Sequence, residues 1–209
     1  MTLVKICGIT NLEDARHALA CGADILGFNF YRGSKRYVDE GYVESIVERL
    51  REPFTKAGVF VNATVDEVLD IERIAELDII QLHGDESPDF VARLREQTSS
   101  QIIKAIQVKA DVDPKIVLDY DVDGILFDTF TIEGVRGGSG TTFDWDLVNL
   151  FSKVPSLYLA GGLNPENVAD AIRKVRPYAV DVASRVESSP RKKDPKKVEA
   201  FIKAAKEAI

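Results

Sequence analysis

The sequence predicts a (β/α)8 TIM barrel with parallel strands, formed as one domain by residues 1–209. Eight short runs rich in Val, Ile, Leu and Phe recur without regular polar alternation, as in strands buried on both faces of a parallel sheet. Stretches with helical spacing separate these runs. Eight near-equal units favour a closed barrel over an open doubly wound sheet, although the chain is short for a barrel. The runs are Leu3–Cys7, Ile25–Phe30, Ala57–Val61, Ile79–Leu82, Ile102–Ile106, Gly124–Phe127, Leu157–Ala160 and Ala179–Val182.

Capping signals predict where several helices begin. A Thr followed three residues later by Glu forms a capping box, and a capping residue before Pro suits a helix start. A further segment, Ser188–Lys193, is expected to be a polar loop with a solvated basic face before the last helix. The capping boxes are Thr10 with Glu13 and Thr64 with Glu67, and the pairs with proline are Ser87-Pro88, Asn164-Pro165 and Asp194-Pro195.

Composition and charge limit the classes of function. The net charge of −7 argues against a nucleic-acid partner, which would favour a basic face, but a local site can still bind an anion. The two cysteines, Cys7 and Cys21, make no disulfide framework and lack the spacing of zinc ligands. The first residues do not resemble a signal peptide, and no apolar window is long enough to span a membrane. We therefore expect a cytoplasmic protein with no membrane partner.

Active sites of barrels form at the carboxyl ends of the strands, so polar residues there are the candidate site residues. The first run ends in Cys7, which is either a small buried apolar residue or a reactive thiol at the barrel mouth. The second run leads into a loop that carries Arg32, Lys35 and Arg36. These cations suit a carboxylate or a phosphate, or else form a solvated loop.

The fourth and sixth runs end in candidate acid–base and binding groups. Gln81 and His83 are two residues apart at a strand end and should point the same way. A lone histidine is often a structural residue with satisfied hydrogen bonds, but at this strand end we expect both side chains to contact substrate. Asp128 follows an apolar run, where desolvation tends to raise the pKa of a carboxyl. Asp128 could then act as a general acid, or it could cap a loop.

The seventh and eighth runs predict a phosphate site. Gly161 and Gly162 precede a helix start, where backbone N–H groups commonly bind phosphate. The eighth run contains Asp181 and leads to Ser184 and Arg185. Since the loops after strands seven and eight hold phosphate in many barrels, we expect the two glycines, Ser184 and Arg185 to bind one.

These motifs, taken together, resemble the phosphoribosylanthranilate isomerase family. The resemblance runs in order over essentially the whole chain, and the combination is specific although each piece alone is not. The segments that carry it are Lys5–Thr10, Gln81–Gly84, Asp128-Thr129, Gly137–Gly140, Phe143–Trp145, Leu159–Asn164, Asn167-Val168 and Val180–Val182.

The resemblance implies an isomerase of tryptophan biosynthesis. The family converts N-(5′-phosphoribosyl)anthranilate to 1-(2-carboxyphenylamino)-1-deoxyribulose 5-phosphate by an Amadori rearrangement, which requires no metal or cofactor. Cys7 matches the general base of the family, Asp128 its general acid, and Arg36 the arginine that holds the anthranilate carboxylate. Asp181 matches a further site aspartate. The phosphate-loop positions match Gly161, Gly162 and Ser184.

The implied chemistry sets a condition on the base. Cys7 must be a thiolate near neutral pH, and neighbouring cations can lower the pKa of a thiol. Lys5 is two residues from Cys7, so both should lie on one face of the strand. We therefore expect Lys5 to assist the ionisation of Cys7.

Two arginines depart from the family pattern. Arg185 and Arg191 stand where the family commonly has glycine. Arginine resists a positive φ, which glycine adopts freely, so the conformation at Arg191 is in question. The guanidinium of Arg191 could instead bind the phosphate.

Two other functions remain as alternatives. One is the sister barrel isomerase of the histidine pathway, which acts on an aminoaldose; its strand-one base is aspartate, so Cys7 argues against it. The other is a non-catalytic barrel that binds a phosphorylated sugar, with Arg185 and Arg191 as signs of drift. In each case the partner is a small phosphorylated molecule, and the sequence leaves monomer and homodimer open.

Overall fold

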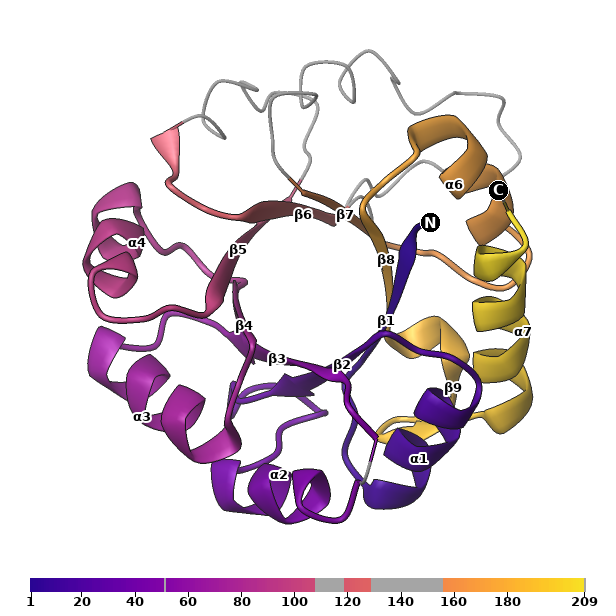
Figure 1. Cartoon of the computed structure of the whole chain (residues 1–209), viewed down its shortest axis with the longest axis horizontal. Helices are drawn as coiled ribbons and strands as arrows, with labels where there is room; N and C mark the ends of the chain where they lie inside the picture. Colours follow the sequence, from indigo (N-terminus) through magenta and orange to yellow (C-terminus); the bar gives the residue numbers. More distant parts are fainter. Residues whose placement is uncertain (51, 108–118, 129–155, 209) are drawn as a thin grey trace.

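Eight parallel strands close into a barrel in the computed structural model of the chain, which describes residues 1–50, 52–107, 119–128 and 156–208 (Figure 1). Each strand pairs with the next, and β1 pairs with β8 to complete the ring. The predicted barrel is therefore confirmed. The strands are β1 (Leu3–Cys7), β2 (Ile25–Asn29), β3 (Thr55–Phe60), β4 (Ile79–Leu82), β5 (Gln101–Gln107), β6 (Gly124–Asp128), β7 (Leu157–Ala160) and β8 (Ala179–Val182).

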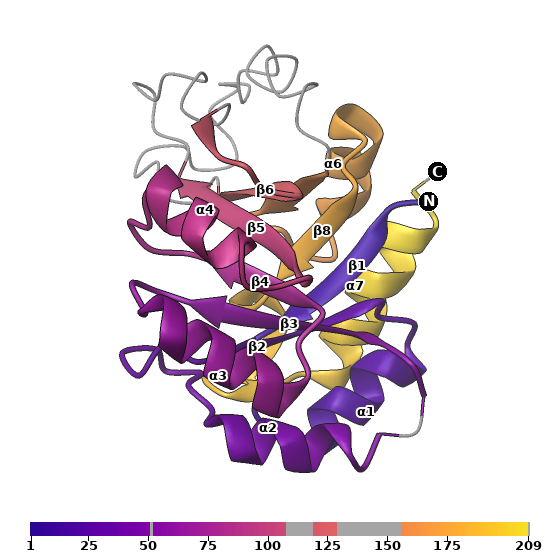
Figure 2. The same ribbon diagram turned by 60° about the vertical axis from the view of Figure 1, so that its left-hand side comes forward.

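Helices cover the outside of the ring. Figure 2 shows α7 lying beside β1, with the two chain termini close together at one end of the barrel. A short hairpin follows β8, formed by β9 (Glu187–Ser189) and β10 (Lys192–Lys193). The helices are α1 (Leu12–Ala20), α2 (Glu40–Val47), α3 (Val65–Ala75), α4 (Pro88–Arg95), α6 (Val168–Val175) and α7 (Pro195–Lys206), with a 3-10 turn η3 (Ser184–Val186).

Both faces of the strands are buried, which explains why the runs lack polar alternation. On β1, Val4 and Ile6 belong to the apolar layer between strands and helices, whereas Lys5 and Cys7 occupy the alternate positions. The inner layer of the barrel contains apolar side chains such as Leu126 and Tyr158. Because side chains alternate along a strand, the inward positions nearest the carboxyl ends are left to line the mouth.

The helix caps confirm three of the predicted starts. Thr64 and Glu67 form a complete capping box at α3. Ser87 caps α4 and Asp194 caps α7, each with proline in the first turn. In each case a side-chain oxygen accepts from backbone N–H groups that the helix leaves unpaired.

Two predicted caps are wrong. Thr10 does not cap α1, because the cap is Asn11, whose Oδ1 accepts from the N–H of Asp14 at 2.9 Å. Asn164 does not cap α6, which begins at Val168. Its Oδ1 instead accepts from the N–H groups of Glu166 and Asn167, at 2.9 and 3.0 Å, and so stabilises the turn before the helix.

Ser188–Lys193 is not a plain loop, because it forms most of the β9–β10 hairpin, although Ser188–Arg191 are exposed as expected. Its last residue, Lys193, is buried. The Lys193 Nζ donates to the carbonyl oxygens of Cys7 at 2.6 Å and Ala183 at 3.0 Å. Burial still lowers the pKa of Lys193, so these partners offset only part of the cost of burying the ammonium group.

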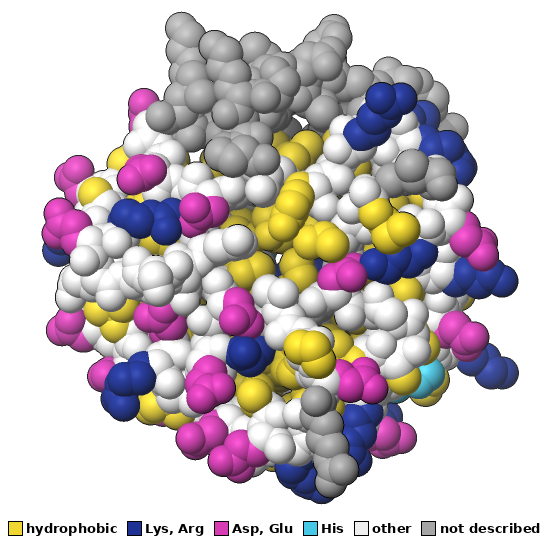
Figure 3. Space-filling model, viewed as in Figure 1, with side chains coloured by type: hydrophobic (Ala, Val, Ile, Leu, Met, Phe, Trp, Pro, Cys, Tyr) yellow, Lys and Arg dark blue, Asp and Glu magenta, His cyan; other side chains and the backbone are white. Residues whose placement is uncertain are grey.

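The surface seen in Figure 3 carries charges of both signs. Lys and Arg side chains are interspersed with Asp and Glu along the described part of the rim, and hydrophobic side chains lie nearer the centre of this face. Within the described residues, no helix is long and apolar enough to cross a membrane.

Candidate active site

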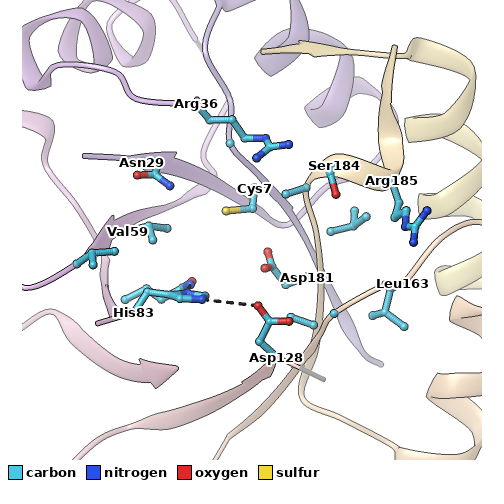
Figure 4. A pocket seen from close by; sticks show the side chains of 18 residues that line it. Cys7, Asn29, Arg36, Val59, His83, Asp128, Leu163, Asp181, Ser184 and Arg185 are labelled. Carbon is cyan, nitrogen blue, oxygen red and sulfur yellow. Dashed lines mark hydrogen bonds and ion pairs between the residues drawn. The ribbon is translucent and has the colours of Figure 1, made fainter. Parts of the chain in front are cut away.

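A pocket of about 460 Å³ opens at the carboxyl ends of the strands, and every predicted site residue lines it (Figure 4). The predicted residues are Cys7, Arg36, Gln81, His83, Asp128, Gly161, Gly162, Asp181, Ser184 and Arg185. Residues that the sequence did not single out complete the wall, among them Asn29 and Val59. Both side chains occupy inward positions near the carboxyl ends of their strands. Their positions along the predicted strands could therefore have identified them as pocket residues.

The Cys7 thiol points into the pocket from the end of β1 (Figure 4). Gly27 is its partner on β2, and a Cβ atom placed at Gly27 would lie 2.9 Å from the Cys7 Sγ. Such a contact is too close for carbon and sulfur atoms, so the thiol fits here because residue 27 has no side chain. This steric role of Gly27 was not predicted.

Lys5 and Asp181 form a buried ion pair beside Cys7. The Lys5 Nζ donates to Asp181 Oδ1 at 2.8 Å, and the two residues are register partners across β1 and β8. Burial on its own would lower the pKa of Lys5, but the Asp181 carboxylate and the thiolate form of Cys7 raise it above its ordinary value. Lys5 is therefore a cation at neutral pH.

The Cys7 thiol is not tuned as expected. Burial raises its pKa, and the opposing effects of Lys5 and Lys193 do not cancel that rise. The Asp181 carboxylate raises the pKa of Cys7 further. Lys5 thus favours the thiolate as predicted, but the net pKa is above the ordinary thiol value, so the expected lowering is wrong.

His83 and Asp128 face each other across the mouth of the barrel. His83 Nε2 lies 3.7 Å from Asp128 Oδ2, which is the interaction drawn in Figure 4. Gln81 Nε2 lies 2.9 Å from His83 Nδ1, as expected for two side chains that point the same way. If the amide donates, Nδ1 accepts, and the proton of a neutral imidazole is on Nε2, facing Asp128.

The Gln81 side chain keeps one polar atom unpaired. Its Oε1 is buried and has no hydrogen-bond partner within the described part of the chain. A buried carbonyl oxygen without a partner is unfavourable. Since Gln81 lines the pocket, this oxygen is a candidate acceptor for a ligand hydroxyl.

Arg36 crosses the upper edge of the pocket in Figure 4 and is held there by Glu187. Its Nε and Nη2 donate to the two carboxylate oxygens of Glu187, each at 2.6 Å. Gly8 has a φ of +73°, and a Cβ atom at this position would overlap the Cδ of Arg36. Glu187 was not predicted, because nothing in the sequence pairs it with a residue 151 positions away.

The predicted phosphate residues line the pocket at the ends of β7 and β8. Gly161 and Gly162 both have positive φ values, 83° and 65°, which glycine adopts without strain. Ser184 and Arg185 lie in η3, and Arg185 does not have a positive φ. The exchange of glycine for arginine at position 185 therefore requires no left-handed backbone.

Arg191 does adopt the conformation that arginine resists, with a φ of 74°. Its guanidinium donates to the carbonyl oxygens of Lys35 at 3.2 Å and Tyr37 at 2.9 Å. Arg191 does not line the pocket. The phosphate role considered for its guanidinium is therefore not supported.

Part of the sequence resemblance lies outside the described residues, namely Thr129, Gly137–Gly140 and Phe143–Trp145. Within the described ranges, no group of three or more His, Cys, Asp or Glu side chains could hold a metal ion.

Comparison with known proteins identifies the family. The family model of N-(5′-phosphoribosyl)anthranilate (PRA) isomerase matches residues 4–204. The enzymes of that name from Thermotoga neapolitana and Thermotoga maritima are 47% and 45% identical to the chain, each over 207 residues and 99% of both sequences.

Solved structures agree with the sequence comparison. The crystal structure of phosphoribosyl anthranilate isomerase from Thermotoga maritima matches with a TM-score of 0.88 at 45% identity, over 99% of both chains. A phosphoribosyl anthranilate isomerase in complex with reduced 1-(o-carboxyphenylamino)-1-deoxyribulose 5-phosphate matches with a TM-score of 0.86 at 42% identity, again over 99% of both chains. The chain therefore belongs to the N-(5′-phosphoribosyl)anthranilate isomerase family.

Proposed function

We propose that the chain converts N-(5′-phosphoribosyl)anthranilate to 1-(2-carboxyphenylamino)-1-deoxyribulose 5-phosphate in tryptophan biosynthesis. The observation that carries the proposal is the layout of one pocket: a thiol and a carboxyl at strand ends, an arginine at one edge and paired glycines at another. This substrate has a carboxylate at one end, a phosphate at the other and the reacting carbons between them. The pocket contains a group suited to each of these parts of the substrate.

Asp128 is the proposed general acid. Its proton passes to the ring oxygen of the ribose, the C1′–O bond breaks, and the nitrogen lone pair forms a C1′=N Schiff base. His83, 3.7 Å away, is placed to hold the Asp128 carboxyl toward the pocket. General acid catalysis of this kind contributes roughly 10²–10⁴-fold to rates.

Cys7 is the proposed general base. Its thiolate removes the proton from C2′, and the electron pair moves through C1′ to the nitrogen to give an enolamine. The enolamine then tautomerises to the ketone. Because burial raises the pKa of the thiol, the positive charges of Lys5 and Lys193 are needed to keep the thiolate accessible.

The remaining pocket residues are proposed to bind the two ends and the hydroxyls of the substrate. Arg36 takes the anthranilate carboxylate. Gln81 and His83 contact the sugar, with Gln81 Oε1 as the acceptor for a hydroxyl, and Asp181 borders the reacting carbons beside Cys7. The phosphate is assigned to Gly161, Gly162, Ser184 and Arg185.

We also propose the partner, the domain organisation and the cellular setting of the enzyme. The partner is a small phosphorylated substrate, and residues 1–209 act as one catalytic domain. A cytoplasmic, reducing environment would keep Cys7 a free thiol, as the base role requires. Both a monomer and a homodimer are compatible with the site, and the relative from Thermotoga maritima is described as dimeric.

A fluorescence assay tests the function. N-(5′-phosphoribosyl)anthranilate is made in situ and its consumption is followed with wild type and with Cys7→Ala. We expect rapid consumption by wild type, a loss on the order of 10²-fold or more in Cys7→Ala, and a nearly unchanged melting temperature. Tight binding by wild type without turnover would instead indicate a binding-only barrel, and near-normal turnover by Cys7→Ala would overturn the base assignment.

A further inference from the structure

The β9–β10 hairpin contacts both the side chain of Arg36 and the backbone of the loop that carries it. Glu187, the first residue of the hairpin, pairs with the Arg36 guanidinium through two hydrogen bonds of 2.6 Å. Arg191, at the turn of the hairpin, donates to the carbonyl oxygens on either side of Arg36, those of Lys35 and Tyr37. The hairpin thus fixes both the guanidinium and the chain that carries it.

Arg191 is held in a strained conformation by its contacts. A φ of 74° costs a residue with a Cβ atom about 1 kcal/mol or more, and such strain persists only when the surroundings fix it. Thr10 supplies part of that restraint, because its hydroxyl donates to the Arg191 carbonyl at 2.6 Å. The side-chain bonds to Lys35 and Tyr37 add to this restraint.

The base of the hairpin is anchored to the strand that carries Cys7. The buried Lys193 Nζ donates to the Cys7 carbonyl oxygen at 2.6 Å and lies 3.4 Å from Glu187 Oε1. Glu187 therefore lies between two cations, Arg36 and Lys193. Lys193 thus fixes the position of the Glu187 carboxylate relative to the end of β1, and Glu187 in turn orients Arg36.

Among the described residues, the pairing with Glu187 leaves one edge of the Arg36 guanidinium without a partner. A guanidinium has five N–H groups, and Glu187 uses one on Nε and one on Nη2. One N–H of Nη1 and the second N–H of Nη2 form the end-on edge, which can bind another carboxylate through two bonds. This edge is the one suited to a substrate carboxylate in the pocket that Arg36 lines.

We propose that Arg191 is a positioning residue for substrate binding: by fixing the backbone on both sides of Arg36, it presents the end-on edge of that guanidinium to the substrate carboxylate. This inference rests on the proposed function. Arg191 acts through Arg36 and has no contact with the reacting atoms. Its removal therefore weakens substrate binding and leaves the chemical step intact.

Arg191→Gly is the informative substitution, because glycine accepts the positive φ and only the guanidinium contacts are lost. Arg176→Gly is the matched control: Arg176 also has a positive φ, 50°, but is exposed at the end of α6, before β8 and away from the pocket. We expect Arg191→Gly to raise KM about 5-fold with kcat within about 2-fold, and Arg176→Gly to change neither.

A double-mutant cycle separates positioning from a general structural effect. Arg36→Ala should raise KM by itself, and adding Arg191→Gly to it should raise KM no further if Arg191 acts only through Arg36. Equal KM increases by Arg191→Gly in both backgrounds, or a fall in kcat with KM unchanged, would overturn the inference.

Hydrogen exchange gives a readout that does not depend on turnover. The amides of Tyr37 and Val38 donate to Ser34 and Asn29 carbonyl oxygens, and we expect both to exchange at least about 5-fold faster in Arg191→Gly but not in Arg176→Gly. Unchanged exchange would show that Arg191 does not fix the loop. If wild type shows no turnover, the proposed function fails, and this measurement still decides whether the hairpin holds the Arg36 loop.

Discussion

Lys5 and Asp181 form a 2.8 Å ion pair inside the barrel, between the first strand and the last, one inward position below Cys7 on β1. The pair places a cation and an anion beside the same thiol. Lys5 lowers the pKa of Cys7 and Asp181 raises it, while burial raises it most. Ionisation of the proposed base therefore depends on this pair.

Lys5→Met should make Cys7 harder to ionise. The substitution removes the cation that favours the thiolate and leaves the Asp181 charge uncompensated, and both changes raise the pKa of the thiol. Alkylation by iodoacetamide reports the thiolate, so its rate at Cys7 should reach its midpoint at a higher pH in Lys5→Met than in wild type. The measurement uses a Cys21→Ser background, so that Cys7 is the one reactive thiol.

The same variant should lose activity at neutral pH in proportion to its lost thiolate. A combined Lys5→Met and Asp181→Asn variant controls for the unpaired carboxylate, and its thiol should ionise at a lower pH than that of Lys5→Met alone. An alkylation midpoint for Lys5→Met at or below the wild-type pH would contradict the role assigned to Lys5.

Asp128→Asn tests the general acid. The amide keeps the size of the carboxyl but has no acidic proton, so kcat should fall on the order of 10²–10⁴-fold while the melting temperature changes little. Asp123→Asn is the control, because Asp123 precedes β6 and accepts from Arg95 and from the Ile102 N–H outside the pocket. That variant should lose stability and keep its kcat. Retention of more than about a tenth of kcat by Asp128→Asn would rule out the acid role.

The sequence predicted the strands and the site positions, because both depend on local pattern. Apolar runs buried on two faces are distinctive, and the polar residue at the end of each run faces the pocket once the barrel closes. Cys7, Asp128 and Asp181 were located in this way. The capping box at Thr64 is equally local.

Features that depend on contacts between distant segments were not predictable. The partner of Arg36 is Glu187, and the burial of Lys193 depends on carbonyl groups from β1 and from the end of β8. A charged segment such as Ser188–Lys193 has the composition of a solvated loop until its partners are known. The pKa of Cys7 follows from burial inside the barrel, which composition does not reveal.

Gly27→Ala should impair catalysis through the thiol. The added methyl group would lie 2.9 Å from the Cys7 Sγ and 3.0 Å from its Cα, so the side chain or β1 must shift. We expect a loss of about 10-fold or more in kcat and about 1–3 kcal/mol in the free energy of unfolding. Gly41→Ala, in the first turn of α2, is the control, since the nearest neighbour of its added methyl group would be Asp39 Oδ1 at 3.7 Å.

Gly41→Ala should leave kcat unchanged and stabilise the fold by about 0.4–1 kcal/mol, because alanine lowers the entropy of the unfolded chain. Turnover and urea unfolding of the two variants provide the comparison. Equal kcat values for Gly27→Ala and wild type would show that the thiol does not need the space that Gly27 leaves.

Lys104→Met should destabilise the loop that follows β4. Lys104 donates to Glu86 Oε2 at 2.9 Å and to the Gly84 carbonyl at 2.6 Å, and both side chains are buried. Glu86 also accepts from the N–H groups of Asn62 and Gly84, so it joins the loop after β3 to the loop after His83. Removing the cation leaves a buried carboxylate without its counter-charge, which costs about 3–5 kcal/mol.

Urea unfolding tests this expectation against Lys56→Met, which breaks a more exposed pair with Asp78 at 3.2 Å and should cost less than about 1 kcal/mol. Adding Glu86→Gln to Lys104→Met should restore part of the loss, because a neutral amide oxygen still accepts from the backbone and leaves no buried charge. Activity should fall in Lys104→Met but not in Lys56→Met, since only the former loosens the segment next to His83. Similar unfolding free energies for the two single variants would show that the Lys104–Glu86 pair does not hold these loops.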